Sequence, residues 1–267
     1  MIVQPRLAST ILLLRDRATP APNLEVFMVR RAVQSEFVPD VYVFPGGSAS
    51  QDDRDAETTP GLCAPVATSA ADPEGRTALG TGARAAAIRE VFEEANVLLA
   101  YQDGSMLAVT EATEARFSAY RQAFNQRQGS LVTLTHDENL TLATDQLAYF
   151  AHWITPIGMP KRYDTHFFLA SAPIAQEALY DQLETSDGMW VTPVEALERF
   201  NAGTFPLAFP THRQLRDLSA YRTTREALAA AAVNYVPTKR SIIKDIDGVP
   251  HIMLLEDPEH PWSTQPL

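Results

Sequence analysis

The chain has 267 residues, 45% of them hydrophobic and 9% aromatic, so it carries enough apolar material for a packed core and is not of the disordered class. It holds 33 Asp or Glu and 22 Lys or Arg, which gives a net charge of −11. That balance excludes a protein that coats nucleic acid or an anionic membrane, because such binding needs clustered excess Lys and Arg. Cys63 is the only cysteine, so an intramolecular disulfide is excluded and a reducing, cytoplasmic compartment is the simpler prediction.

The apolar runs are too short to cross a bilayer, since a helical span needs about 20 residues. The longest runs cover residues 11–14 and 227–233. Residues 7–14 imitate a signal peptide faintly, but Ser9 and Thr10 interrupt the run, and a first β-strand is the better interpretation. The length allows one large domain or two small ones.

Two β-strands are predicted first, over 8–14 and 24–30, joined by a proline-rich connection. A third short strand over 41–44 ends at Pro45-Gly46-Gly47, where proline lacks a donor and glycine frees the backbone. We expect the backbone there to shape a site. From 48 to 84 the composition shifts to Ala, Thr, Asp, Gly and Pro without aromatic residues, which predicts a long surface loop or insertion.

Helical periodicity returns over 85–99. Ile88, Val91, Phe92 and Ala95 recur there at the i, i+3, i+4, i+7 spacing of one buried face. The sequence therefore predicts an amphipathic helix.

Alternating helices and strands follow. Thr192 and Thr211 both begin patterns typical of a capping box, and Asp247-Gly248 favours a tight hairpin turn. The whole succession predicts an α/β (α+β) fold in which helices cover a mixed sheet. Helices are predicted over 111–128, 192–200 and 211–218, and strands over 150–154, 165–170, 189–191, 241–246 and 249–255.

Three carboxylates project from one side of the predicted helix 85–99. At 100° per residue, Glu90, Glu93 and Glu94 point away from its apolar face. Like charges at this spacing repel by about 0.2–0.5 kcal/mol per pair. A divalent cation would compensate them, because Mg²⁺ is a hard ion that prefers carboxylate oxygens. The alternative is an acidic face that is merely solvated.

Gly46-Gly47 after a strand, followed by Arg89-Glu90-Val91-Phe92-Glu93-Glu94, resembles the Nudix box of the Nudix hydrolase superfamily. The box consists of a glycine, a glutamate, and then Arg-Glu-aliphatic-any-Glu-Glu-any-Gly-aliphatic. Asn96 stands at the position of the last glycine, and Asn tolerates the left-handed conformation of a helix cap.

The first half of the box is stretched. Counting its spacing forward from Gly47 places Asp53 at the first glutamate, whereas counting back from Arg89 places Thr81 there. A long insertion at this place is typical of the peroxisomal-type acyl-coenzyme A diphosphatase branch, which the chain resembles along nearly its whole length. Further runs that carry the resemblance are Val43 to Gly47, Val97-Leu98-Leu99, Trp153 to Pro156, Arg162 to Leu169 and Asp247 to Leu255.

The resemblance implies a Nudix fold: a mixed β-sheet sandwiched between α-helices in one domain spanning 1–267. The insertion would cover about 48–84, and a C-terminal helical extension would cover about 205–267. Trp153, Phe167 and Phe168 are predicted core residues, and stacking on an adenine is the alternative for each.

The resemblance also implies hydrolysis of a nucleoside diphosphate derivative with Mg²⁺ or Mn²⁺ as cofactor. Glu90, Glu93, Glu94 and the Gly47 carbonyl would be metal ligands, with Glu90 as either ligand or base. Arg89 would orient the carboxylates through charge-assisted hydrogen bonds. The general base stays open: Glu138 and Asp145 are candidates, and the alternative for each is an ordinary surface residue.

The phosphates of a nucleoside diphosphate substrate need basic side chains nearby, because the chain as a whole is acidic. Arg30 with Arg31, and Lys161 with Arg162, are the basic pairs expected near the site, and edge protection of strands is the alternative. His166 is predicted to be a structural strand residue rather than a ligand. Cys63 has no His or acidic partner in motif spacing and is not expected to be a nucleophile.

Three functions compete. The first is hydrolysis of coenzyme A or acyl-CoA to adenosine 3′,5′-bisphosphate and (acyl-)4′-phosphopantetheine. The second is a diphosphatase for ADP-ribose or another nucleoside diphosphate derivative, and the third is a non-catalytic binding module. The predicted partner is a small-molecule substrate and not nucleic acid or a membrane. The resemblance also implies a possible homodimer, because dimers are common among Nudix proteins. The acyl-chain preference is not fixed by the sequence.

Overall fold

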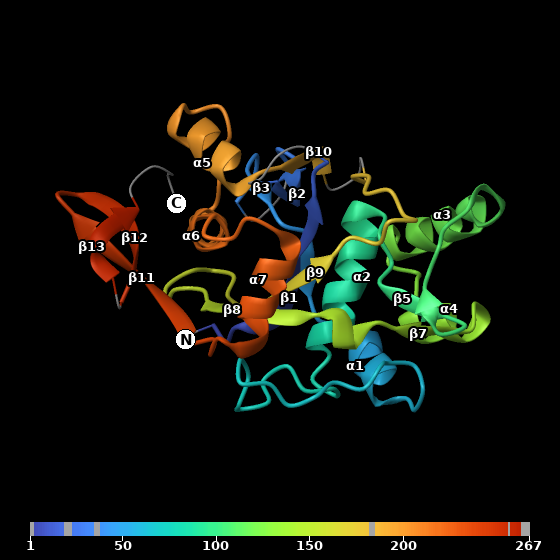
Figure 1. The fold of residues 1–267 in the computed structure, drawn as a ribbon. Helices are drawn as coiled ribbons and strands as arrows, with labels where there is room; N and C mark the ends of the chain where they lie inside the picture. Colours follow the sequence, from blue (N-terminus) through green and yellow to red (C-terminus); the bar gives the residue numbers. More distant parts are fainter. Residues whose placement is uncertain (1–2, 19–22, 35–37, 182–184, 256, 263–267) are drawn as a thin grey trace.

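A computed structural model describes residues 3–18, 23–34, 38–181, 185–255 and 257–262 (Figure 1). Within this part of the chain, none of the helices combines the length and the apolar composition that a membrane span requires. The helices are α1 (Gln51–Thr58), α2 (Ala83–Ala95), α3 (Glu111–Asn125), α4 (Leu131–Asp137), α5 (Pro193–Asn201), α6 (Phe209–Leu218) and α7 (Thr224–Val233), with a short 3₁₀ turn at Thr144–Gln146.

A mixed sheet of ten strands runs through the described residues in the order β10-β2-β1-β9-β8-β11-β12-β13, with β3 added to β2 and β4 added to β1. β1 and β9 pair in parallel, while β2 and β4 pair antiparallel to β1. The strands of this sheet are β1 (Arg6–Asp16), β2 (Leu24–Arg31), β3 (Tyr42–Val43), β4 (Gly46–Ser48), β8 (Ala148–Ile154), β9 (Tyr163–Ser171), β10 (Thr185–Val191), β11 (Thr238–Ile246), β12 (Val249–Leu254) and β13 (Asp257–Trp262). A separate small sheet contains β5 (Ala100–Gln102), β6 (Ser105–Met106) and β7 (Leu140–Leu142).

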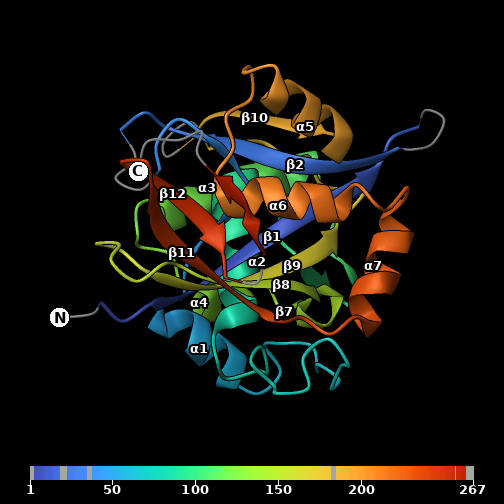
Figure 2. The same ribbon diagram turned by 90° about the vertical axis from the view of Figure 1, so that its left-hand side faces the viewer.

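Helices cover both faces of the large sheet, as the sequence predicted. Side chains alternate along a strand, so Phe168 and Ala170 of β9 pack with α2, whereas Phe167 and Leu169 pack with α6 and α7. In Figure 1, α2 lies on one side of the strands and α6 and α7 on the other, and Figure 2 views the second face from the front. The predicted core positions Trp153, Phe167 and Phe168 are buried.

The acidic helix α2 ends earlier than its periodicity suggested. Asn96 adopts the left-handed conformation, with φ of 60°, and its N–H donates to the carbonyls of Val91 and Phe92. This confirms the expected cap. At the other predicted boundaries, Thr192 does cap α5, because its side chain accepts from the N–H of Glu195. Thr211 was the wrong choice for α6: the helix begins at Phe209, with Pro210 in its first turn, where a missing N–H costs nothing.

The region 48–84 is not simply a loop, so that prediction needs correction. It contains the helix α1, which begins with a capping box between Ser50 and Asp53. The rest of the insertion is irregular but tied to distant parts of the chain: Ala71 accepts from the N–H of Val236, and Arg76 donates to the carbonyl of Val236. The sequence did not predict α1 because this helix is strongly polar and shows no apolar periodicity.

The described part of the predicted C-terminal extension, residues 205–255 and 257–262, is helical only at its start. After α6 and α7, β11 joins the main sheet by parallel pairing with β8, from Thr238 opposite His152 to Arg240 opposite Ile154. The predicted hairpin is confirmed, because Asp247 and Gly248 both have positive φ between β11 and β12. This hairpin and β13 reach away from the helices at one end of the molecule (Figure 1).

Glu57 of α1 caps the start of α2. Helix α2 begins after Gly82 without a side-chain cap of its own, which leaves its first N–H groups needing acceptors. The Glu57 carboxylate accepts from the N–H groups of Gly80, Gly82, Arg84 and Ala85, at 2.7 to 3.0 Å. The insertion therefore stabilises the helix that carries the acidic cluster.

Substituting Glu57→Gln should lower the free energy of unfolding by about 1–3 kcal/mol, because the amide would turn a donor toward N–H groups and lose the negative charge at the helix start. Urea denaturation measures this loss. Glu74→Gln in the same insertion is the matched control, since Glu74 is 59% exposed. Equal losses in the two variants would contradict the capping role.

Burial of His212 on α6 predicts a pH dependence of stability. Partial burial and the charges of Arg216 and Arg213 together lower its pKa to about 4, while an unfolded histidine titrates near 6.5. Because the unfolded chain binds the proton more readily, this group favours folding fully above about pH 6.5 and loses that contribution as the pH falls toward 4. The stability difference between pH 7 and pH 5 should shrink in His212→Gln. It should stay unchanged in a variant of the exposed His136.

Candidate active site

The acidic cluster lies where α2 passes over β4. The N–H of Gly46 donates to Glu94 at 3.0 Å. A Cβ on Gly47 would lie only 2.5 to 2.7 Å from the carboxylate atoms of Glu90, so only glycine allows this approach. Gly47 in turn pairs with Ser9 of β1. The structure thus places the two halves of the box against each other, as their motif requires.

Gly47→Ala should therefore displace the Glu90 carboxylate and weaken Mn²⁺ binding by tenfold or more, with little loss of stability. Electron paramagnetic resonance of Mn²⁺ measures the affinity. Ser48→Ala is the control, because the side chain of Ser48 is exposed and its contact with the site is made by the backbone carbonyl. Unchanged Mn²⁺ affinity in Gly47→Ala would contradict the prediction that Glu90 is a metal ligand.

Arg89 holds the carboxylates together. Its Nε and Nη2 donate to the two oxygens of Asp53, each at 2.9 Å. Its Nη1 donates to Glu90 at 2.7 Å and to Glu93 at 2.9 Å. Its Nη2 also reaches the Ser48 carbonyl at 2.9 Å. Bidentate Arg–carboxylate pairs of this kind fix geometry as well as charge.

This clamp resolves the ambiguity in the stretched box. Asp53 is fully buried and meets Arg89 directly, whereas Thr81 lies in the turn before α2. The motif's first acidic position is therefore filled by Asp53, counted forward from Gly47. The extra residues of the stretched box lie between the end of α1, the helix that carries Asp53, and the start of α2, the helix that carries Arg89.

Burial makes the cluster costly without a cation. Burial raises the pKa of Glu90 to about 7, with Glu93 adding to the rise and Arg89 opposing it. Burial also raises the pKa of Glu94, and the neighbouring Glu90 carboxylate raises it further. The negative charges of these carboxylates therefore exceed the positive charges of the arginines beside them. This all-oxygen donor set fits a hard divalent ion such as Mg²⁺ or Mn²⁺.

The basic residues predicted for phosphate binding fall into two places. Arg31, at the end of β2, lies close enough to Glu94 to lower the pKa of that carboxyl. Arg30 forms an ion pair with Asp40 at 2.9 Å. Arg162 is buried at the start of β9 and donates to the carbonyls of Thr155 and Val3. Those bonds give Arg162 a structural role, and phosphate binding by it stays a prediction.

The two candidate bases are held in pairs of their own. Glu138 accepts from Arg116 at 2.8 Å, and Asp145 accepts from the Tyr101 hydroxyl at 2.9 Å. The sequence missed a further carboxylate, Asp181, whose charge raises the pKa of Glu94. Asp181 lies just before β10, outside every motif, and its carboxylate accepts from the N–H and the hydroxyl of Thr185.

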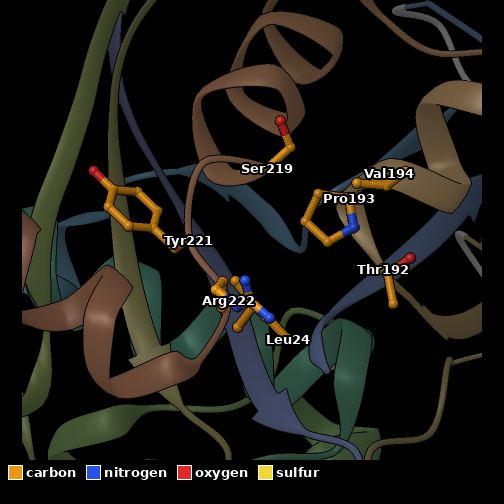
Figure 3. A pocket seen from close by; sticks show the side chains of 7 residues that line it. All are labelled: Leu24, Thr192, Pro193, Val194, Ser219, Tyr221 and Arg222. Atoms are coloured by element: carbon orange, nitrogen blue, oxygen red, sulfur yellow. The ribbon is translucent and has the colours of Figure 1, made fainter. Parts of the chain in front are cut away.

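A pocket of about 160 Å³ lies elsewhere. Side chains from the start of β2, the start of α5 and the turn between α6 and α7 surround it (Figure 3), and none of them belongs to the acidic cluster. It is lined by Leu24, Thr192, Pro193, Val194, Ser219, Tyr221 and Arg222. The candidate site is therefore defined by its carboxylates and not by the volume of a pocket.

The sheet, the acidic helix and the Gly-Gly approach together define a Nudix hydrolase fold. The solved structure of a NUDIX hydrolase from Alicyclobacillus acidocaldarius has the same fold, with a TM-score of 0.72 over 87% of this chain and 99% of that one, at 24% identity. Residues 68–218 match the family model of the NUDT19 Nudix domain. Because this match covers more than half of the chain, the protein belongs to that family.

Curated relatives agree with this assignment. The chain is 27% identical over 238 residues to acyl-coenzyme A diphosphatase NUDT19 of Gallus gallus, covering 74% of this chain and 63% of the relative. It is 25% identical over 235 residues to the Xenopus laevis protein of the same name, covering 76% and 62%. The chain thus spans less than two thirds of the length of these two relatives.

Proposed function

We propose that this protein hydrolyses the diphosphate bond of coenzyme A or acyl-CoA, with Mg²⁺ or Mn²⁺, to adenosine 3′,5′-bisphosphate and (acyl-)4′-phosphopantetheine. The observation that carries the reaction type is the Arg89 clamp, which holds Asp53, Glu90 and Glu93 in one buried cluster. The substrate class is supported by the relatives named acyl-coenzyme A diphosphatase.

In this proposal Glu90, Glu93, Glu94 and the Gly47 carbonyl hold the cation. The bound cation would neutralise the diphosphate oxygens and lower the pKa of the attacking water. Arg89 keeps the carboxylates oriented, so that little reorganisation is needed when charge develops on the phosphate oxygens.

Basic side chains would then meet the substrate's phosphates. Arg31 is the best supported of those predicted, because its charge lowers the pKa of Glu94. Arg30 would contribute after exchanging Asp40 for a phosphate, and Arg162 remains a more distant candidate. The proton of the attacking water would pass to Glu90, whose pKa burial raises to about 7.

A substrate panel tests the proposal. Coenzyme A, acetyl-CoA, a long-chain acyl-CoA, ADP-ribose and a nucleotide sugar are each incubated with the protein and Mg²⁺ or Mn²⁺ in H₂¹⁸O, and the products are identified by mass spectrometry. We expect both products from coenzyme A substrates, with ¹⁸O on one of them. Cleavage of ADP-ribose without cleavage of any coenzyme A substrate would replace the proposed substrate class. No cleavage at all would favour a binding module.

The remaining features of the proposal concern the setting of the reaction. We expect a single domain, a homodimer and a cytoplasmic location, with a small-molecule substrate in place of nucleic acid or membrane. The charge of −11 supports the last point, since it repels polyanions. Light scattering coupled to gel filtration measures the oligomeric state, and a monomeric mass at micromolar concentration would contradict the homodimer.

A further inference from the structure

A second cluster of metal-ligating side chains lies on strands β8 and β9. His152 and His166 are directly opposite each other across the antiparallel pair, and Asp164 lies two residues before His166. The ligand atoms of the three side chains all lie within 4.8 Å of one another. The Nε2 of His152 contacts Oδ1 of Asp164, and the Nε2 of His166 is 3.8 Å from the same oxygen. The two imidazole nitrogens thus converge on one carboxylate oxygen.

The other nitrogen of each ring is fixed by a hydroxyl group. The Nδ1 of His166 is 2.8 Å from the Tyr149 hydroxyl, and the Nδ1 of His152 is 2.9 Å from the Thr238 hydroxyl. A hydroxyl can accept from Nδ1–H, which leaves the Nε2 lone pair free to bind a metal. Partners of this kind orient histidine ligands in metal sites. The rings are stacked, with centroids 4.4 Å apart and an angle of 8° between the planes, so one ring must rotate before both Nε2 lone pairs point at one ion.

We propose that His152, Asp164 and His166 form a binding site for a borderline divalent metal ion of the zinc class, separate from the carboxylate cluster on α2. Two imidazoles and one carboxylate suit zinc, whereas magnesium prefers oxygen ligands alone. Three protein ligands leave the fourth position of a tetrahedral ion open.

The two histidines of the site are buried, and the aspartate is partly exposed to solvent. The His152 and His166 side chains are each 5% exposed, whereas the Asp164 side chain is 34% exposed. An ion can therefore approach along the aspartate. All three ligands lie on paired strands rather than on a loop, so their positions are held by the backbone hydrogen bonds of the sheet.

The site shares a sheet face with the acidic cluster but no ligand. Gly47 pairs with Ser9, and Ser9 pairs with His166, so two strand spacings separate the Gly47 backbone from that of His166. At about 4.8 Å per spacing, this is roughly 10 Å. The inference does not depend on the proposed function, because its ligands, metal class and test are independent of diphosphate cleavage.

Zinc binding in excess Mg²⁺ tests the site, since excess Mg²⁺ would compete for the oxygen ligands of the carboxylate cluster on α2. The full chain is stripped of metal with a chelator, returned to buffer with Mg²⁺, and titrated with Zn²⁺ by calorimetry. Bound zinc is then counted by elemental analysis after dialysis. We expect one Zn²⁺ per chain in the wild type and at least a hundredfold weaker binding in Asp164→Asn and His166→Gln. Tyr149→Phe should weaken binding by about 10–100-fold, because it removes only the hydroxyl that orients His166.

Two variants serve as controls. Glu93→Gln alters the carboxylate cluster, and His136→Gln alters an exposed histidine beside Asp137; both should keep the wild-type zinc affinity. Circular dichroism checks that each variant is folded. If His166→Gln does not fold, the zinc affinity of Asp164→Asn alone tests the proposal. The proposal is overturned if the folded wild type binds no zinc, if Asp164→Asn binds it as tightly as the wild type, or if Glu93→Gln abolishes binding.

Discussion

Asp53→Ala should destabilise the protein by about 3–5 kcal/mol, because it leaves the buried Arg89 guanidinium without its bidentate partner. Asp53 is fully buried and both of its oxygens accept from Arg89. Urea denaturation measures the free energy of unfolding. Activity should fall in the folded fraction too, since Arg89 would no longer hold Glu90 and Glu93 in place.

Two controls separate this pair from other roles of the same residue. Asp55→Ala removes an exposed carboxylate from the same helix and should cost less than about 1 kcal/mol. Asp53 also accepts from the N–H and hydroxyl of Ser50, so Ser50→Ala measures the helix cap, which contributes about 1 kcal/mol. A loss in Asp53→Ala no greater than that in Ser50→Ala would mean that the clamp contributes nothing to stability.

Glu93→Gln should lower kcat for the best substrate by about 10³-fold, because each 1.36 kcal/mol of lost transition-state stabilisation costs tenfold and a bound cation supplies several kcal/mol. The fold should persist, since the Glu93 side chain is 19% exposed and Arg89 keeps its pairs with Asp53 and Glu90. Steady-state kinetics measure the rate, and a thermal melt measures stability.

Glu114→Gln is the matched control for Glu93→Gln, because Glu114 is an exposed glutamate on the neighbouring helix α3. It should leave kcat unchanged. If the Glu93 variant keeps the wild-type rate at saturating Mg²⁺, the assignment of Glu93 as a metal ligand is wrong. If both variants lose activity together with their melting transitions, the effect is on folding and the metal role is not supported.

The local features of the site were predictable from the sequence. Helix α2 follows from the spacing of Ile88, Val91, Phe92 and Ala95, all of which are buried. Its end follows from Asn96, which takes the left-handed conformation that few other residues tolerate. These features depend on neighbours within one or two turns, so a pattern in the chain suffices.

Helix α1 was not predicted from the sequence, because its buried face is mostly charged. Its buried residues are Asp53, Ala56 and Glu57, so two of the three are carboxylates. Pattern analysis identifies a buried face by its apolar side chains, because burying a charge without a partner is costly. Here the partners exist but lie far along the chain: Arg89 for Asp53, and the first N–H groups of α2 for Glu57.

The sequence by itself determined the acidic face of α2 and its left-handed cap at Asn96, because these depend on helical period and chirality. Only the tertiary structure decided that Asp53 meets Arg89 and that His152, Asp164 and His166 meet. Packing of α1 against α2 decides the first contact. Strand register decides the second, since a shift of one residue would turn each side chain to the opposite face of the sheet.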